Sequence, residues 1–235
     1  MDDRTTARPI PLGLTALVAF FSALVALAVA NGHDAHAHGN EPQAAVVVAH
    51  TPATQTTKAF ALRTDMRKLW EDHITWTRLA IISLTTGSPD TQATVGRLLQ
   101  NQTDIGNAVK PFYGKAAGNE LTRQLKQHIL IAADVVAAAK AGDQAKLGDA
   151  QARWTANGDT IAGVLASVNP KFWKLAAMKA ELRMHLKLTT DEAVARLQGK
   201  WAADVAAYER IHAHALHLSD LLADGLVRQF PQRFR

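Results

Sequence analysis

Histidine is the residue of this sequence best suited to chemistry. The 235-residue chain contains ten histidines and no cysteine. The lack of cysteine excludes disulfides, thiolate metal sites, iron–sulfur clusters and cysteine nucleophiles. Carboxylates, amides, hydroxyls and imidazoles remain, and imidazole nitrogen is the group among them that suits Zn(II) and Cu(II).

The densest run of ionisable residues lies near the carboxyl terminus. Glu209 and His212 are three residues apart, a spacing that lets two side chains on a helix bind one metal ion. His214 and His217 have the same spacing, and together with His185 they are candidates for a mononuclear Zn(II) or Cu(II) site. The ligand count argues against a di-iron centre, because the chain has one Glu-x-x-His motif and six glutamates. The competing interpretation is that the histidines lie in the core in hydrogen-bonded pairs.

The first thirty residues have the pattern of an export signal. Arg4 and Arg8 precede an uncharged apolar stretch, residues 10–30, that ends in Ala-Val-Ala. These are the charged, apolar and cleavage regions of a secretory signal peptide. Because 21 apolar residues also suffice to cross a bilayer, an uncleaved membrane anchor is the alternative. Either way, the rest of the chain is predicted to be extracytoplasmic, meaning secreted, periplasmic or anchored in the cell envelope.

Residues 31–57 are predicted to form a disordered, histidine-rich tether, because they mix Gly, Pro, Thr and Ala without helical or strand periodicity. Cleavage after residue 30 would leave Asn-Gly-His at the amino terminus. Its free amine, two amides and the imidazole of His33 can form the square plane of nitrogens that suits Cu(II) or Ni(II). The alternative is a polar spacer with incidental histidines. The predicted metal ligands of the whole chain are His33, His36, His38, His185, His212, His214, His217 and Glu209.

The elements that must position these side chains are helices. The chain is rich in Ala and Leu and has no run of alternating β-branched residues, which predicts an all-α fold. Three histidines recur at intervals of 55 and 57 residues, and a glycine follows each of them 14 residues later. Such glycines favour a break between two helices. The three pairs are His73 with Gly87, His128 with Gly142 and His185 with Gly199.

This recurrence predicts a bundle over residues 58–235, built from three tandem antiparallel helical hairpins with about six helices. The repeats cover about residues 58–113, 114–173 and 174–231. A proline near the end of each repeat is expected to stop its second helix. In the third repeat, residues 188–192 have the pattern of a break followed by a new helix start. The three prolines are Pro111, Pro170 and Pro231.

Each hairpin also carries a second polar residue inside its apolar seam. It follows the glycine by 14 or 15 residues, so it lies at the height of the histidine on the first helix. Because a buried imidazole without a partner costs about 1–3 kcal/mol, the sequence predicts pairing across each hairpin. The expected pairs are His73 with Asn101, His128 with Asn157, and His185 with His214. In the metal interpretation, His73 or His128 would instead complete the site of His185, His214 and His217.

Residues 70–78 combine two tryptophans with acids and a histidine, a pattern that predicts either a ligand pocket between helices or ordinary core. Other functional classes have little support. The formal net charge of +5 comes from scattered basic residues, which argues against nucleic-acid binding and leaves attraction to an anionic membrane surface. No Gly-rich phosphate loop, Ser-His-Asp order or nucleophile elbow is present in the sequence, so hydrolase and kinase chemistry have no residues to support them.

Four segments, WEDHITWTR, NQTDIGNAVKPFYG, HILIAADVV and the terminal QFP, resemble a family of exported bacterial all-helical proteins of unassigned function. The resemblance covers roughly residues 63–234. Some relatives carry the labels acetylglutamate kinase or glycosyltransferase, which belong to α/β folds and have no support in this sequence. The resemblance implies the helical architecture and supplies no catalytic residues.

Two functions follow from the sequence. The first is an extracytoplasmic helical binding or scaffold protein, its ligand unspecified, that sequesters a transition metal such as Cu or Zn through histidines. The second is a metalloenzyme with a histidine and carboxylate site inside the bundle. Convergent histidine and carboxylate side chains around a vacant point would favour the metalloenzyme, whereas three separate pairs, each within its own hairpin, would favour the binding protein.

Overall fold

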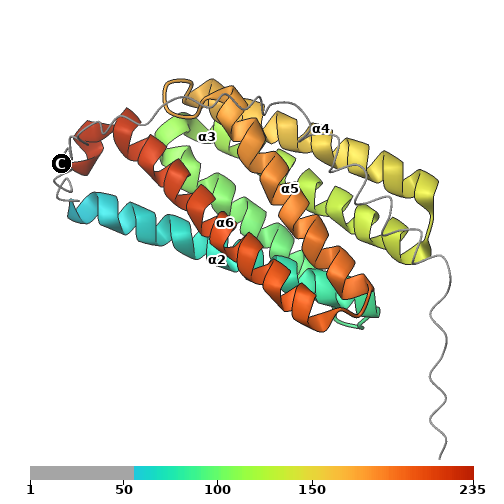
Figure 1. The fold of residues 1–235 in the computed structure, drawn as a ribbon. Coiled ribbons are helices and arrows are strands. Elements are labelled where there is room, and N and C mark those ends of the chain that lie inside the picture. Colours follow the sequence, from blue (N-terminus) through green and yellow to red (C-terminus); the bar gives the residue numbers. More distant parts are fainter. Residues whose placement is uncertain (1–55) are drawn as a thin grey trace, which may run out of the picture.

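The computed structural model describes residues 56–235, which form an all-α antiparallel bundle of five helices with no strand in this range (Figure 1). The all-helical prediction is therefore confirmed for this part of the chain. None of the helices within residues 56–235 is long and apolar enough to cross a membrane. The helices are α2 (Thr57–Thr86), α3 (Thr91–Ala141), α4 (Gln144–Val168), α5 (Leu175–Leu197) and α6 (Trp201–Gln229), followed by the short 3₁₀ helix η1 (Pro231–Phe234).

Glycines in the left-handed region separate the helices, as the sequence predicts. Gly87 ends α2 with a φ of 72°, and Gly142 ends α3 with a φ of 70°. Gly199, with a φ of 66°, lies between α5 and α6. Side chains with a Cβ rarely adopt this conformation, so glycine is the residue that reverses the chain at these three turns.

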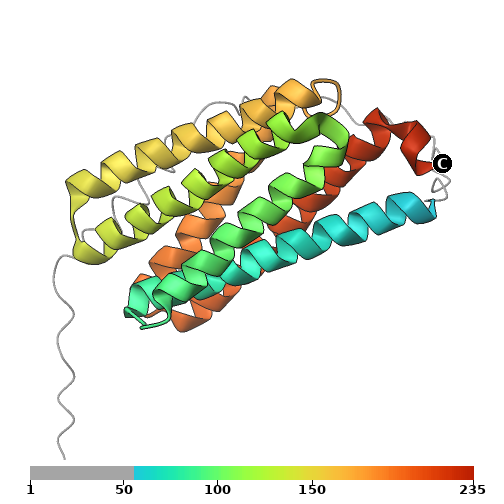
Figure 2. The same ribbon diagram turned by 180° about the vertical axis from the view of Figure 1, so that it is seen from behind.

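Helix α3 is bent back on itself at Gly114, so two of the about six predicted helices are the two arms of this one element. Gly114 has non-helical dihedral angles (φ 81°, ψ 172°) inside α3, and Figure 2 shows the two arms of the helix running back beside each other. Pro111 was expected to end a helix, but it lies inside α3 and the chain turns three residues later. The arms touch closely, because a Cβ on Gly106 would lie 2.7 Å from the carbonyl oxygen of Gly118.

The predicted break at residues 188–192 is wrong, because α5 continues through it to Leu197. The hydroxyl of Thr189 donates to the carbonyl oxygen of His185 over 2.9 Å, which satisfies the hydroxyl within the helix. Lys187 and Asp191 form an ion pair one turn apart, 2.7 Å between nitrogen and oxygen. Local bonds therefore keep this polar stretch helical.

The bundle encloses one large apolar core and a buried ionic cluster. Met66, Ile74 and Ile211 are among the side chains that fill the core, and the indole of Trp173 lies against Gly225, where a Cβ would be 1.9 Å from its nitrogen. Towards the turn between α5 and α6, the guanidinium of Arg78 on α2 binds both Glu192 on α5 and Asp204 on α6. This cluster ties three helices together at one end of the bundle.

Candidate functional site: a buried histidine cluster

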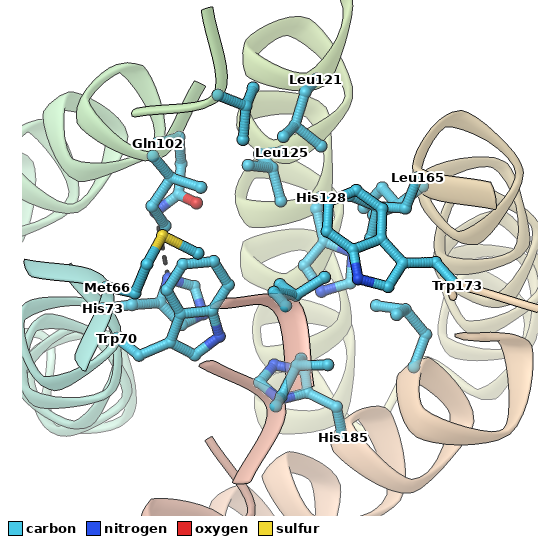
Figure 3. A pocket seen from close by; sticks show the side chains of 16 residues that line it. Met66, Trp70, His73, Gln102, Leu121, Leu125, His128, Leu165, Trp173 and His185 are labelled. Atoms are coloured by element: carbon cyan, nitrogen blue, oxygen red, sulfur yellow. Dashed lines mark hydrogen bonds between the residues drawn. The ribbon is translucent and has the colours of Figure 1, made fainter. Parts of the chain in front are cut away.

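Four histidines from four helices meet inside the bundle. His185 on α5 lies at the centre, with its ring centroid 5.8 Å from that of His73 on α2 and 6.2 Å from that of His128 on α3. His214 on α6 lies 6.0 Å from His185 on the other side. Figure 3 shows the rings of His73, His128 and His185 approaching one another across the space between the helices. The histidines therefore gather in one place, whereas the sequence predicted three pairs, each within its own hairpin.

His128 is fully hydrogen-bonded, and its predicted pairing is confirmed. Its Nδ1 lies 2.8 Å from Oδ1 of Asn157, and because an amide oxygen only accepts, Nδ1 carries the proton. Nε1 of Trp154 donates to Nε2 of His128 over 3.1 Å. The Asn157 amide is itself fixed by donating to the carbonyl and side-chain oxygens of Gln124. Burial lowers the pKa of His128 to about 4, so the ring is neutral at pH 7.

His73 interacts with the predicted Asn101 and also with its neighbour Gln102. Nε2 of Gln102 donates to Nδ1 of His73 over 3.2 Å. Asn101 accepts from Gln102 through Oδ1 and donates to the carbonyl oxygen of Leu69. Spacing alone gave the correct height on the helix, but it did not distinguish two neighbouring amides that are both fully buried. Burial lowers the pKa of His73 to about 4, while the amide of Asn101 opposes the shift.

His185 lacks the partner that the sequence assigned to it. His214 is close, but its Nε2 donates to the backbone carbonyl oxygen of Glu181 over 3.2 Å. Nδ1 of His185 is buried and has no hydrogen-bond partner within residues 56–235. Burial is the largest effect on its pKa, which lies well below 6.5, and the neighbouring His73, His128 and His214 lower it further. His185 is thus a neutral imidazole with an unused nitrogen.

The cluster borders a cavity of about 60 Å³ between the helices. Its wall is mostly apolar, and the side chains of Met66, Leu121 and Leu165 contribute to it (Figure 3). His73, His128, His185 and the amide of Gln102 supply the polar part of the wall. Oε1 of Gln102 is buried without a partner, like Nδ1 of His185. Nε1 of Trp173, which also lines the cavity, is a third such atom. Native proteins rarely leave buried polar atoms of this kind without a water or a ligand.

Trp70 and His73 are the residues of the 70–78 run that face the cavity. The run was predicted to form either a pocket wall or core. Trp70 and His73 are both buried and both line the cavity, so they belong to the core and to the pocket wall. Arg78, at its end, instead belongs to the ionic cluster with Glu192 and Asp204.

The predicted metal ligands on α6 point in different directions. His212 lies 2.8 Å from a carboxylate oxygen of Glu71 and stacks on Tyr208, while Glu209 is exposed. His217 is 63% exposed, so it lies outside the buried cluster. Within residues 56–235, no three histidine, aspartate or glutamate side chains stand in an arrangement ready to hold a metal ion. His33, His36 and His38 lie outside the described residues.

Sequence reasoning missed Gln102 and the buried carboxylates, although a signal for the carboxylates exists. Asp204 continues the buried stripe of Ala207 and Ile211 on α6, and Glu192 continues the stripe of His185 on α5. A charge in line with an apolar stripe indicates a buried ion pair. Burial raises the pKa of Glu192, whereas Arg78 and Arg196 hold the pKa of Asp204 below its usual range despite burial.

Comparisons with known proteins add no family or function. No protein-family model matches the chain, and no curated protein or solved structure shows significant similarity to it. The resemblance described from the sequence motifs therefore stays a prediction, and the functional argument depends on the geometry of the site.

Proposed function

We propose that this chain is an exported helical binding protein whose ligand is a small, uncharged molecule held in the cavity beside the histidine cluster. The observation that carries the proposal is that three residues lining the cavity each have a buried polar atom without a partner: Oε1 of Gln102, Nδ1 of His185 and Nε1 of Trp173. Leaving such an atom unpaired costs about 1–3 kcal/mol. A ligand that bonds to these atoms would remove this cost on binding.

The neutral wall of the cavity favours an uncharged ligand. His73 and His128 have pKa values of about 4, so neither supplies a positive charge at pH 7. No Lys, Arg, Asp or Glu lines the cavity, and the buried Arg78, Glu192 and Asp204 already bind one another. An ion placed in this apolar space would lose its hydration without a counter-charge.

The unsatisfied atoms also define the polar end of the ligand. Gln102 offers an acceptor, because its amide nitrogen already shares its two hydrogens among Nδ1 of His73, Oδ1 of Asn101 and the carbonyl oxygen of Leu98. The ligand must therefore carry an O–H or N–H donor. Its remaining atoms would contact Met66 and Leu165, so they are apolar. A volume of about 60 Å³ corresponds to the liquid volume of about two waters, and it limits the ligand to a few non-hydrogen atoms.

The finer architecture in this proposal is the one predicted from the sequence. Three tandem hairpins would each contribute one histidine to the common cluster, and the signal peptide or anchor and the tether would place the bundle outside the cytoplasm. The bend at Gly114 supports this division, because it falls at the predicted boundary between the first two hairpins. The alternative, a metalloenzyme using the central histidines, is favoured by their convergence. However, it needs nitrogens that His128 has already committed to Asn157 and Trp154.

Native mass spectrometry of the full chain, purified from the cells that produce it, tests the binding function. We expect a fraction of the protein to carry a small non-covalent mass that denaturation releases. Leu165→Phe, which fills the cavity, should lose this mass. The matched control Leu130→Phe changes a residue that is 52% exposed and should retain it. An unmodified protein whose native and denatured masses agree would contradict the proposal, as would equal retention by both variants.

A further inference from the structure

One end of the bundle is strongly basic, although the basic residues are scattered along the sequence. Four segments meet there: the start of α2 (56–60), the bend of α3 (110–116), the connection between α4 and α5 (169–175) and the chain from the end of α6 onwards (227–235). Together they contain eight lysines or arginines and no aspartate or glutamate. We call this surface the basic end, and its charged residues are Lys58, Lys110, Lys115, Lys171, Lys174, Arg228, Arg233 and Arg235.

Contacts between the four segments show that they lie together. The hydroxyl of Thr56 donates to a backbone carbonyl oxygen of η1. Arg233 on η1 donates to the carbonyl oxygen of Pro111 over 2.8 Å, which joins η1 to the bend of α3. The guanidinium of Arg228 lies 4.4 Å from the ring centroid of Phe172, which joins the end of α6 to the α4–α5 connection. Both Figure 1 and Figure 2 show these segments at one end of the bundle and the three glycine turns at the other.

The opposite end of the bundle has a much smaller excess of positive charge. Three segments around the glycine turns have a similar total length and contain four basic and two acidic residues: 84–93, 139–146 and 195–202. There Lys146 pairs with Asp143, and Arg196 pairs with Asp204. At the basic end, none of the eight lysines and arginines forms an ion pair with a carboxylate within residues 56–235. Its positive charge is therefore available to an anionic partner.

Exposed apolar side chains accompany these charges. Phe60 is 61% exposed and Leu175 is 48% exposed. Lys58 lies two residues before Phe60, and Lys174 immediately precedes Leu175. Basic side chains beside exposed aromatic and aliphatic ones are typical of surfaces that bind anionic bilayers, because the apolar groups enter the interface while the cations attract the lipid phosphates. A soluble acidic polymer would satisfy the charges but not the apolar side chains.

The connection to the preceding part of the chain also favours a membrane. Thr56 lies at the basic end, so the chain joins the bundle on this side. Residues 10–30, for which the sequence predicts a signal peptide or a membrane anchor, precede it and lie outside the described residues. If they are an anchor, the basic end is the part of the bundle to which the membrane is tethered.

We propose that the basic end docks on the surface of an anionic phospholipid bilayer, with Phe60 and Leu175 at the level of the headgroups. The attraction acts between exposed charges, so added salt screens it. Neutral lipid supplies no negative surface potential and is a poor partner. The proposal concerns the outside of the bundle and does not depend on the ligand of the cavity.

Sedimentation of the full chain with lipid vesicles tests the proposal. One set of vesicles contains phosphatidylcholine alone, and the other contains phosphatidylcholine mixed with phosphatidylglycerol. We expect the protein to prefer the anionic vesicles and to lose this preference in high salt. Lys171→Gln combined with Lys174→Gln should weaken binding to the anionic vesicles by at least about tenfold, because each basic residue near such a surface contributes about fivefold.

The matched control combines Lys146→Gln with Lys200→Gln, which removes the same charge at the opposite end. Both lysines are exposed, like Lys171 and Lys174. The control should weaken binding less than about threefold, because its charges lie far from the bilayer. Binding through residues 10–30 would not distinguish the two double variants. Circular dichroism melts of both double variants confirm that the helices remain folded.

A fluorescent label tests which end touches the bilayer. Because the chain contains no cysteine, one introduced cysteine carries an environment-sensitive fluorophore at a single chosen position. Phe60→Cys places the label at the basic end. Trp201→Cys places it at the opposite end, on a residue that is 60% exposed and so closely matches Phe60. With saturating anionic vesicles, the emission from position 60 should shift to shorter wavelength, and the emission from position 201 should not.

Three results would overturn the proposal: equal binding to both kinds of vesicle, equal binding by the two double variants, or a larger shift from position 201 than from position 60. Binding to a soluble acidic polymer such as polyglutamate without binding to vesicles would also overturn it. That result would assign the basic end to an acidic protein instead of a membrane.

Discussion

His128 and His185 occupy similar positions in the bundle and differ in one respect. Both are buried, both are neutral at pH 7, and each stands 14 residues before a glycine turn. His128 uses both of its nitrogens in bonds to Asn157 and Trp154, whereas Nδ1 of His185 has no partner. The same spacing to a glycine therefore gives His128 a structural role and leaves Nδ1 of His185 available to bond to a ligand.

The difference shows how to separate structural from functional polar groups in a core. A fully bonded group stabilises one arrangement of the helices, because any other arrangement leaves donors and acceptors unsatisfied. An unsatisfied group weakens the fold, so its presence requires another explanation such as a ligand. By this criterion His128 belongs to the scaffold, and His185 and Gln102 belong to the site.

The largest expected effect is the loss of stability in His128→Leu. This change leaves Nε1 of Trp154 and Oδ1 of Asn157 buried without partners, at about 1–3 kcal/mol each. We expect the free energy of unfolding in urea to fall by about 4 kcal/mol. A loss below about 1 kcal/mol would show that the network of His128 is not structural.

Titration of His128 should make the free energy of unfolding depend on pH. An unfolded histidine binds a proton near pH 6.5, but the folded ring of His128 does so only near pH 4. Between these values the unfolded state binds more protons, so the free energy of unfolding falls as the pH falls. The contribution of His128 is fully present above pH 6.5, and about 3 kcal/mol is lost by pH 4.

Urea unfolding at a series of pH values from 7.5 to 4 measures this effect. Comparison of the wild type with His128→Leu measures the ring of His128 together with its effect on the pKa of the neighbouring His185. The variant should show a weaker decline in stability over this range. Parallel curves would mean that His128 does not remain neutral in the folded protein.

Gln102→Leu should have an intermediate effect. It deprives Nδ1 of His73 and Oδ1 of Asn101 of their donor, but it also removes the unsatisfied Oε1. These changes oppose each other, and we expect a net loss of about 2 kcal/mol in the free energy of unfolding. The small non-covalent mass should disappear from the native spectrum at the same time. If the variant keeps that mass, Gln102 does not bind the ligand.

The smallest effect is expected for His185→Leu. The change removes a buried nitrogen that has no partner and replaces the ring with an apolar side chain. The free energy of unfolding should change by less than about 1 kcal/mol, with a gain as the favoured direction. A loss as large as that of His128→Leu would erase the distinction between the two histidines.

The sequence allowed prediction of features that depend on local spacing. The glycine turns and the pair of His128 with Asn157 follow from positions along single helices, and both are confirmed. The contact between His73 and Gln102 was missed, because helical spacing gives height but not the final side-chain rotation. The convergence on His185 depends on how separate hairpins pack, and a single sequence has no periodic signal for that arrangement.

The ionic cluster was missed for a related reason. Arg78, Glu192 and Asp204 come from three helices and are far apart in the sequence. Each looks like an ordinary charged residue until the helices are placed together. The continuation of the apolar stripes through Glu192 and Asp204 was the available clue.

The bend of α3 at Gly114 has a consequence for how copies of the chain can assemble. The dihedral angles of this residue are accessible essentially to glycine alone, so Gly114→Ala would favour a straight helix instead. A straight α3 of 51 residues would be about 75 Å long and would carry the segments before and after the bend far apart. Each segment would then find its missing partner in a second molecule, giving an intertwined, domain-swapped dimer. In the structure this single glycine lets the two arms of α3 pack against each other within one chain.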